Sequence, residues 1–322
     1  MNKAKLFNMV PNILYSTVGK LKTPRSIAVL MYHEVLPDDF EVDAWTIVKE
    51  SDFRRQLQYI VQEFEVISLD RALQLQQEGQ LGDKRYLVLT FDDGYYGAAS
   101  TIKDVAEEFG VPYTVYVASE AVMDESLFWY DRVIVNCNER GLERLDLREV
   151  GLGEYNFPKS TGYQRWQVTQ KLLTDLKGLS PARREIVVDQ YFPLVKDCPL
   201  RFMNTEELAE LADNPLVTIG GHSHCHNRLN QLDMSGVIAT VEKNKKLLES
   251  WTGQSVNHFA YPNGDYNQDI VDVLIDQGYK TAVTTEAGGW LAEQSPLLIP
   301  RYSIGRYEPL GRLKAKLSGL LQ

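Results

Sequence analysis

Short uninterrupted runs of apolar and β-branched residues recur along the chain, and a turn residue or a polar side chain follows most of them. The two clearest runs are Ile27–Tyr32 and Leu87–Phe91. Runs of this length without alternation are typical of strands buried on both faces of a parallel sheet. Further strands are predicted at Glu65–Leu69, Tyr113–Val117, Leu216–Ile219, Val256–Tyr261, Lys280–Thr284 and Leu297–Pro300.

Apolar residues at helical spacing lie between these runs. Ser51-Asp52 is predicted to cap an amphipathic helix that carries Phe53, Leu57, Ile60 and Val61, and another capped helix is predicted to begin at Asn204. Further helices are predicted at Asp70–Gln77, Ala98–Phe109, Met234–Trp251 and Gln268–Gln277. Strands that alternate with helices predict parallel βαβ units, so the fold class is α/β, and seven or eight strands favour a single, distorted barrel.

The alternation lapses at about 124–200, where the pattern is mostly helical. Helices are predicted at Gln164–Leu176 and Pro181–Tyr191, and Gly151–Tyr163 has the composition of a loop. We interpret this stretch as an insertion between two barrel units that forms a wall or lid over the site.

Composition is that of an ordinary globular protein: 322 residues, of which 44% are hydrophobic and 24% charged. The net charge of −10 argues against nucleic-acid binding. Three widely spaced cysteines give no disulfide framework. No apolar run approaches a membrane span, and the N-terminal stretch does not read as a secretory signal. We therefore expect a soluble, cytoplasmic protein.

Both ends of the chain are basic although the whole is acidic. Residues 1–26 carry five basic residues and no acidic one, and the tail at 304–322 combines leucines at helical spacing with Arg312, Lys314 and Lys316. Such basic, amphipathic ends are able to lie on an anionic membrane, which predicts peripheral contact with the inner membrane surface. The alternative, which we favour for the tail, is a helix packed on the barrel.

Two adjacent carboxylates, Asp92 and Asp93, follow the strand Leu87–Phe91 and precede Gly94. The carboxyl ends of parallel strands are where α/β folds hold their chemistry. Side chains alternate along a strand, so the two carboxylates leave the backbone in different directions. This suits one metal ligand and one proton acceptor. The alternative is a solvated Asp-Gly turn.

Three histidines fall within five residues at His222, His224 and His226. Histidines four apart share one face of a helical turn and are able to bind one cation. Together with a carboxylate from the aspartate pair they make the two-His, one-Asp set of a catalytic zinc site. Spacing alone leaves open a pair that includes His224, or a polar loop without metal. Cys225 is a potential ligand, although a small buried residue is the simpler interpretation.

Two further strand ends carry candidate groups. His33 ends the strand Ile27–Tyr32, so it is a candidate general acid, and the alternative is a core histidine. Phe259–Gly264 ends in Pro-Asn-Gly, a tight turn whose backbone N–H groups are able to face an oxyanion. The alternative there is a plain turn.

These residues together resemble the polysaccharide deacetylases, the NodB-homology group also called carbohydrate esterase family 4. Thr90–Gly94 looks like the first motif of the family, His222-Ser223-x-x-His226 its second, and Phe259–Gly264 its third. The resemblance covers residues 27–303 except the insertion. It implies a distorted (β/α)7 barrel in a single domain and metal-dependent N-deacetylation of amino sugars.

The resemblance also implies a role for each matching residue. Asp92 is the catalytic base, and the backbone N–H near Asn263 stabilises the oxyanion. The implied metal ligands are Asp93, His222 and His226. No histidine follows His258 to supply the late Leu-x-His motif of the family, but Met31-Tyr32-His33 looks like that element moved to the front. This is the circularly permuted arrangement of biofilm exopolysaccharide deacetylases, and it makes His33 the acid.

The chain departs from the family pattern in three places. Ala260 stands where an arginine usually orients the base, and we expect Arg301, just after the last predicted strand, to take that role. Asn263 replaces the usual aromatic residue, and the late Asp-x-x-Asp-Trp motif is missing. These departures concern substrate contacts and the tuning of the base.

The predicted function is that of a metal-dependent N-deacetylase acting on an N-acetylated oligo- or polysaccharide, in polysaccharide or glycolipid biosynthesis. The expected metal is Zn²⁺, with Co²⁺, Ni²⁺ and Fe²⁺ also compatible. Candidate substrate-binding residues are Tyr261, Pro262, Trp129 and Tyr130, with Trp290 as a further aromatic candidate, although each aromatic also fits a core position. The alternatives are a deformylase or other amide hydrolase on a lipid- or nucleotide-linked amino sugar, and a non-catalytic carbohydrate-binding protein.

Overall fold

The computed structural model describes residues 26–40, 42–138, 142–159, 162–195, 198 and 200–321. The basic segment predicted at the N-terminus lies almost wholly outside these residues. Within the described part, no helix is long and apolar enough to cross a membrane.

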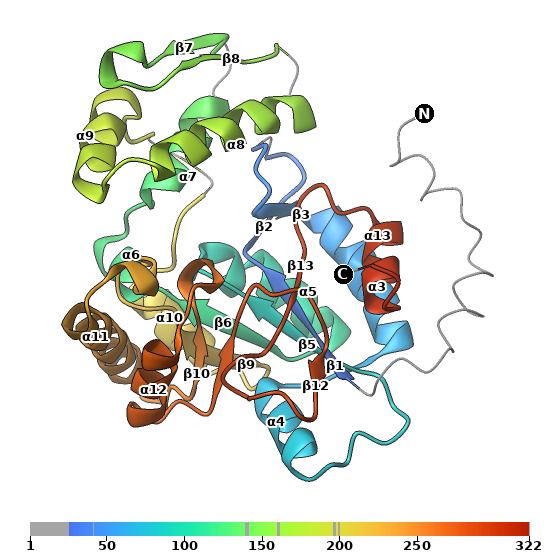
Figure 1. Ribbon diagram of the computed structural model, residues 1–322. Coiled ribbons are helices and arrows are strands. Elements are labelled where there is room, and N and C mark those ends of the chain that lie inside the picture. Colours follow the sequence, from blue (N-terminus) through green and yellow to red (C-terminus); the bar gives the residue numbers. More distant parts are fainter. Residues whose placement is uncertain are drawn as a thin grey trace.

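A curled parallel sheet forms the centre of the molecule (Figure 1). Its strands run in the spatial order β11, β10, β9, β6, β5, β1 and β12, with β4 also paired to β5 and β13 to β1. Only β12 is antiparallel among these pairs. The bounds are β1 Ser26–Tyr32, β4 Glu65–Val66, β5 Tyr86–Phe91, β6 Tyr113–Val117, β9 Val217–Gly221, β10 His258–Ala260, β11 Thr281–Val283, β12 Trp290–Leu291 and β13 Tyr302–Ser303. This is the α/β barrel predicted from the alternating pattern.

The last part of the chain closes the barrel. Ile299 forms a parallel bridge with Val283 of β11, and β13 pairs with Leu30 and Met31 of β1. One continuous segment therefore spans the gap between β11 and β1, and Arg301 lies on it. The strand predicted at Leu297–Pro300 is reduced to this single bridge, because Pro300 has no N–H to donate to a ladder.

Helices cover the outside of the sheet, and each buries an apolar stripe against it. Their bounds are α3 Glu50–Glu63, α4 Leu69–Gln77, α5 Thr101–Phe109, α6 Ser119–Asp124, α10 Thr205–Ala212, α11 Met234–Thr252, α12 Gln268–Asp276 and α13 Leu310–Leu317. Short 3-10 turns lie at η1 Tyr96–Ala99, η3 Leu229–Gln231 and η4 Pro262–Gly264, and a small two-stranded sheet joins β2 Glu34–Leu36 to β3 Ile47–Lys49.

Two predicted helix starts differ from the structure. Helix α3 begins at Glu50, and Ser51 does not cap it, because its hydroxyl donates to Asp38 Oδ1 instead (3.0 Å). The helix predicted at Ala98–Phe109 is split at Ser100 into η1 and α5. Asn204, in contrast, caps α10 through a full capping box with Glu207.

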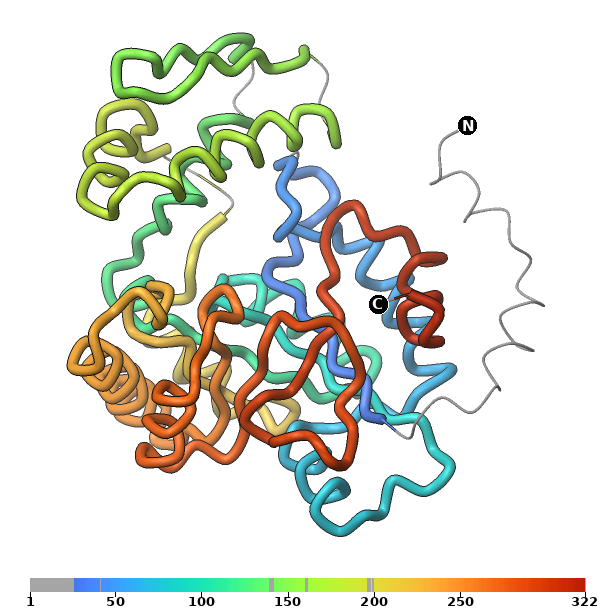
Figure 2. Tube along the Cα trace, viewed as in Figure 1, coloured from blue at the N-terminus to red at the C-terminus, as the bar shows by residue number. Residues whose placement is uncertain are grey.

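The predicted insertion forms a layer above the carboxyl ends of the strands (Figure 2). It contains α7 Trp129–Asn138, β7 Arg144–Asp146, η2 Arg148–Val150, β8 Glu154–Asn156, α8 Tyr163–Lys177 and α9 Pro181–Tyr191. These elements bury a hydrophobic cluster of their own, which includes Val133, Leu172 and Phe192. The stretch predicted as a loop holds β8, which pairs antiparallel with β7. The prediction missed this strand because three residues are too few to show a periodic pattern.

The basic tail packs on the barrel. Leu313, Ala315 and Leu317 of α13 are buried, and Figure 1 shows α13 beside α3. The ammonium group of Lys314 lies 4.6 Å from the ring centroid of Tyr59. Leu313 and Leu317 of the apolar face that was predicted as a membrane contact are therefore used inside the protein, while Leu320 is exposed.

Candidate metal centre and active site

The aspartate pair lies at the carboxyl end of β5. The Asp92 N–H donates to the Tyr32 carbonyl of β1 (3.0 Å), so the ladder continues to this residue. The chain then turns through positive φ at Asp93 (80°) and Gly94 (92°). Both carboxylates are buried, with Asp92 4% and Asp93 2% exposed. The pair is therefore not a solvated turn.

Two histidines converge on Asp93. Its Oδ1 atom lies 3.3 Å from Nε2 of His222 and 3.3 Å from Nε2 of His226, and the three ligand atoms lie within 4.8 Å of one another. Nδ1 of His222 lies 2.8 Å from the Ala260 carbonyl, which orients the ring with Nε2 toward the carboxylate.

The structure chooses among the histidine pairs that spacing left open. Nδ1 of His224 pairs with the Ser119 hydroxyl (2.9 Å), on the α6 side of the loop and away from Asp93. Cys225 lies 3.6 Å from the Thr240 hydroxyl and is half-buried. The converging pair is His222 and His226.

A divalent cation fits this group. Asp93 Oδ1 is a buried oxygen with no hydrogen-bond donor, and leaving such an atom unpaired is costly unless a cation or water meets it. Two imidazole nitrogens and one carboxylate oxygen form a donor set that suits zinc and other first-row divalent ions and leaves coordination positions open.

Arg301 holds the other carboxylate. Its Nη1 and Nη2 donate to Oδ1 and Oδ2 of Asp92, both at 2.7 Å. The guanidinium is itself fixed by the Thr284 carbonyl (2.9 Å) and the Thr90 hydroxyl (3.0 Å). Burial raises the pKa of Asp92, but the charge and hydrogen bonds of Arg301 outweigh it and hold the pKa below its usual value. Asp92 is thus an ionised, oriented carboxylate beside the candidate metal ligands.

His33 follows β1 and shares this end of the barrel. Its ring lies edge-on to Trp45, with ring centroids 5.5 Å apart, and its Nδ1 atom is buried without a partner. Burial lowers the pKa of His33, while the carboxylates of Asp93 and Asp92 act in the opposite direction. The histidine predicted as the acid therefore lies in the electrostatic field of both carboxylates.

Backbone strain gathers at the same place. Among described residues other than glycine, five have positive φ, and four of them are Asp93, Ser223, His226 and Asn263. Such conformations persist only where the surrounding structure enforces them, and they are frequent at functional sites.

The third-motif turn is present, but not every residue in it behaves as predicted. Asn263 is exposed at the tip of η4, and its carbonyl accepts a hydrogen bond from the Thr285 hydroxyl (3.3 Å). Tyr261 is fully buried, and its hydroxyl donates to the Leu297 carbonyl (3.0 Å). Pro262 is buried as well. The prediction that the side chains of Tyr261 and Pro262 contact substrate is therefore not supported.

The start of α7 brings aromatic side chains from the insertion to the metal ligands. The Tyr130 hydroxyl donates to Oδ2 of Asp93 (3.3 Å). Phe128, which the sequence analysis did not select, packs on His226 with ring centroids 5.1 Å apart. The Trp129 ring lies edge-on to the Tyr130 ring, with ring centroids 5.7 Å apart, and packs against Arg184 of α9. Trp290 is buried at the start of β1, at the opposite end of the barrel.

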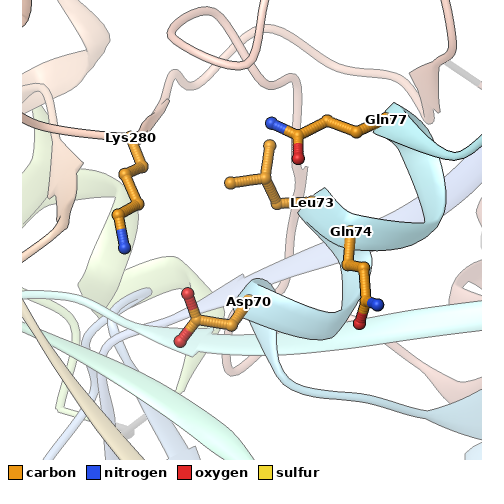
Figure 3. Close-up of a pocket in the computed structure, with 5 residues that line it drawn as sticks. All are labelled: Asp70, Leu73, Gln74, Gln77 and Lys280. Carbon is orange, nitrogen blue, oxygen red and sulfur yellow. The ribbon is translucent and has the colours of Figure 1, made fainter.

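A hollow of about 430 Å³ lies at that opposite end (Figure 3). It is lined by Asp70, Leu73, Gln74, Gln77 and Lys280. Asp70 lies 3.3 Å from Nε2 of His258, the first residue of β10. The hollow therefore faces the amino ends of the strands and shares no residue with the metal ligands.

A family model described as polysaccharide deacetylase matches residues 80–282 of the chain. One curated relative, YxkH of Bacillus subtilis, a polysaccharide deacetylase by name, is 26% identical over 102 residues. That match covers 32% of this chain and about a third, 36%, of the length of the relative.

Solved structures with the same fold cover most of the chain. The Streptococcus pyogenes deacetylase PplD, solved with acetate, has a TM-score of 0.57 at 18% identity and covers 92% of this chain and 99% of its own. IcaB from Ammonifex degensii has a TM-score of 0.60 at 14% identity, with coverage of 91% and 97%. At these identities the likeness shows the fold, in agreement with the predicted barrel.

Proposed function

The chain belongs to the polysaccharide deacetylase family, and from this premise we propose that it removes acetyl groups from N-acetylated amino sugars of a glycan with the help of a divalent metal. The observation that carries the proposal is the convergence of His222 and His226 on the unpaired Oδ1 of Asp93, with Asp92 held ionised beside them. A carbohydrate-binding protein needs no oriented base next to a metal site, which argues against the non-catalytic alternative.

The three converging side chains would hold the metal, for which zinc is our first candidate. When bound, such an ion would polarise a carbonyl oxygen and lower the pKa of water to about 7. The remaining work falls to the residues around it.

Asp92 serves as the general base. It takes a proton from the water that attacks the carbonyl carbon of the acetamide. The two hydrogen bonds from Arg301 fix both carboxylate oxygens, so the base meets the water in one orientation. Arg301 therefore acts as a positioning residue and takes the role of the arginine that the family usually carries in the third motif, at the position of Ala260.

His33 serves as the general acid, and the Asn263 N–H as the oxyanion donor. As the carbon–nitrogen bond breaks, His33 gives a proton to the leaving amine, and acetate and the free amino sugar result. The Asp93 and Asp92 carboxylates favour the protonated form of His33, against the burial that lowers its pKa. A donor held at the strained Asn263 turn needs no rearrangement when the tetrahedral oxyanion forms.

Acetate release from N-acetylglucosamine oligomers tests the proposal. We expect the purified protein to release acetate, to lose this activity with chelator, and to lose it in Asp92→Asn. Formate release from an N-formylated amino sugar, with no acetate from the acetylated one, would favour the deformylase alternative. Bound metal without either product would overturn the proposed reaction.

The expected location is the cytoplasm, in polysaccharide or glycolipid biosynthesis. With Leu313 and Leu317 of α13 buried, contact with the inner membrane surface stays a prediction for the basic segment at 1–26. Co-sedimentation of the full-length protein with anionic liposomes, compared with a chain that starts at Pro24, checks it, and equal pelleting would refute it.

A further inference from the structure

Three basic side chains meet where the insertion faces the third-motif turn. Lys177 ends α8, and its Nζ atom lies 3.5 Å from Oδ1 of Asn263. Arg228 follows the metal ligand His226 by two residues. Arg184, on α9, lies with its guanidinium carbon 4.6 Å from the ring centroid of Trp129. We call Lys177, Arg184 and Arg228 the cationic cluster.

Positive charge is in excess within the cationic cluster. Burial lowers the pKa of Lys177, and the charges of Arg228 and Arg184 lower it further, while Asp265 acts against them. Asp265 is already engaged, because it accepts two hydrogen bonds from the Arg228 guanidinium. Glu185 acts on Arg184 without forming an ion pair with it, so two carboxylates, one of them already engaged, face three cations.

Lys177 and Arg184 lack an acidic partner. Among the described residues, neither makes an ion pair, and the Arg184 Nε atom is buried without a hydrogen-bond acceptor. Like charges held together without a counter-ion cost free energy, which an anionic ligand would offset.

The cationic cluster borders the proposed active site on two sides. Asn263, which Lys177 contacts, is the proposed oxyanion donor. The Trp129 ring, which Arg184 covers, lies edge-on to the Tyr130 ring (ring centroids 5.7 Å apart), and the Tyr130 hydroxyl donates to Asp93. A substituent of a substrate bound at the metal ligands therefore meets Lys177 and Arg184 next.

We propose that Lys177 and Arg184 form a subsite for an anionic group, a phosphate or a carboxylate, that the substrate carries beside the sugar that loses its acetyl group. This inference rests on the proposed function and narrows its substrate class to anionic glycans or phosphate-linked amino sugars. Arg184 offers the planar fork that binds either oxyanion through paired hydrogen bonds, and Lys177 adds a point charge. Arg228, neutralised by Asp265, contributes mainly to the shape of the rim.

The test compares binding of three probes by calorimetry in the Asp92→Asn background, which prevents turnover. The probes are chitotetraose, which is neutral, N-acetylglucosamine 1-phosphate, and a disaccharide of glucuronic acid and N-acetylglucosamine. The variants are Lys177→Gln and Arg184→Gln. Lys84→Gln is the control, because it removes the same charge from an exposed residue just before β5, at the far end of the barrel.

We expect the Kd of at least one anionic probe to rise about tenfold in Lys177→Gln and Arg184→Gln relative to that of chitotetraose, as loss of a charge-assisted hydrogen bond requires. Arg184→Lys should recover part of the loss, and Lys84→Gln should show none. A response to the phosphate probe alone, or to the uronic acid alone, identifies the anion.

The subsite would be overturned if, for both anionic probes, the ratio of the Kd of the probe to the Kd of chitotetraose were the same in all variants. The proposed function is judged separately, by acetate release from chitotetraose in the unmodified protein. The subsite therefore fails or stands whether or not deacetylation is observed. Circular dichroism of Arg184→Gln checks that the insertion remains folded.

Discussion

Two ends of one barrel each hold a histidine against an aspartate at the same distance, and only one of them has the features of a reaction centre. At the carboxyl ends of the strands, Asp93 lies 3.3 Å from His222 and from His226. At the amino ends, Asp70 lies 3.3 Å from His258. The difference lies in the surroundings, because the Asp93 side chain is 2% exposed and that of Asp70 is 58% exposed.

Convergence and burial separate the two pairs. Asp93 receives two imidazoles and has a strained backbone, whereas Asp70 meets one imidazole, and Nδ1 of that ring pairs with the Thr281 hydroxyl (2.8 Å). Water screens an exposed pair, so it contributes little free energy. A His–Asp distance therefore indicates a site only when several donors point at one buried, unsatisfied oxygen.

The largest expected effect comes from Asp93→Asn compared with Asp70→Asn. Removing the charge at the point of convergence should abolish metal retention and reduce acetate release to background, because the ion loses its anionic ligand. Asp70→Asn should leave both unchanged. Metal analysis of the dialysed proteins and an acetate assay measure this, and equal metal loss in both variants would contradict the comparison.

The next largest effect is expected from His33→Gln, compared with His258→Gln at the other end of the barrel. His33→Gln should lower kcat by roughly 10²–10⁴ with metal content retained, because a general acid contributes about that much. His258→Gln should keep its turnover and lose about 1 kcal/mol of unfolding free energy with the Thr281 hydrogen bond. If kcat in His33→Gln matched that of His258→Gln, His33 would not be the acid.

Arg301 tests orientation separately from charge. Arg301→Lys keeps the positive charge but loses the paired hydrogen bonds to Asp92, so kcat should fall about 10²-fold while metal content holds. Arg301→Met should also lower the free energy of unfolding by about 3–5 kcal/mol, since it leaves a buried carboxylate unpaired. Steady-state kinetics and denaturant titration measure the two effects.

Arg312→Met is the matched control for Arg301→Met. Arg312 is exposed, and its partner Glu308 also pairs with Lys316 (3.1 Å), so loss of Arg312 should cost about 0–1 kcal/mol. A similar cost for both variants would mean that Asp92 does not depend on Arg301.

The smallest effect concerns the contribution of the insertion to the metal ligands. Tyr130→Phe removes the hydroxyl that donates to Asp93 Oδ2, and metal affinity should fall about tenfold, as for other hydrogen bonds to metal ligands. Competition with a chelator measures the affinity. Tyr155→Phe removes a hydroxyl that donates to Asp175 elsewhere in the insertion and should leave the affinity unchanged.

Sequence predicted the parts of the molecule that local patterns determine. The strand Tyr113–Val117 and the helix Pro181–Tyr191 have the predicted bounds, because a continuous apolar run and an N-terminal proline are local signals. The two-His, one-Asp group was also predictable, since Asp93 and His222 follow the ends of buried strands, which meet in a barrel, and His226 follows His222 by four residues.

The sequence did not show which way side chains turn once the elements pack. Trp129, Tyr130 and Tyr261 were equal candidates by composition, yet only Tyr130 reaches a metal ligand, and Phe128 beside it packs on His226. The aromatic triplet at 128–130 marked the region but not the orientation of each ring. The contact of Lys177 with Asn263 joins residues 86 positions apart and has no local signal.

Arg301 lies on the segment that completes the barrel, and this has a consequence for the order of synthesis. A chain made from its N-terminus carries Asp92 and all three metal ligands long before the closing segment leaves the ribosome. Until then, Asp92 has no arginine to stabilise its charge, and β1 and β11 are not joined. The proposed base is therefore oriented only after the closing segment has been made and has folded onto the barrel.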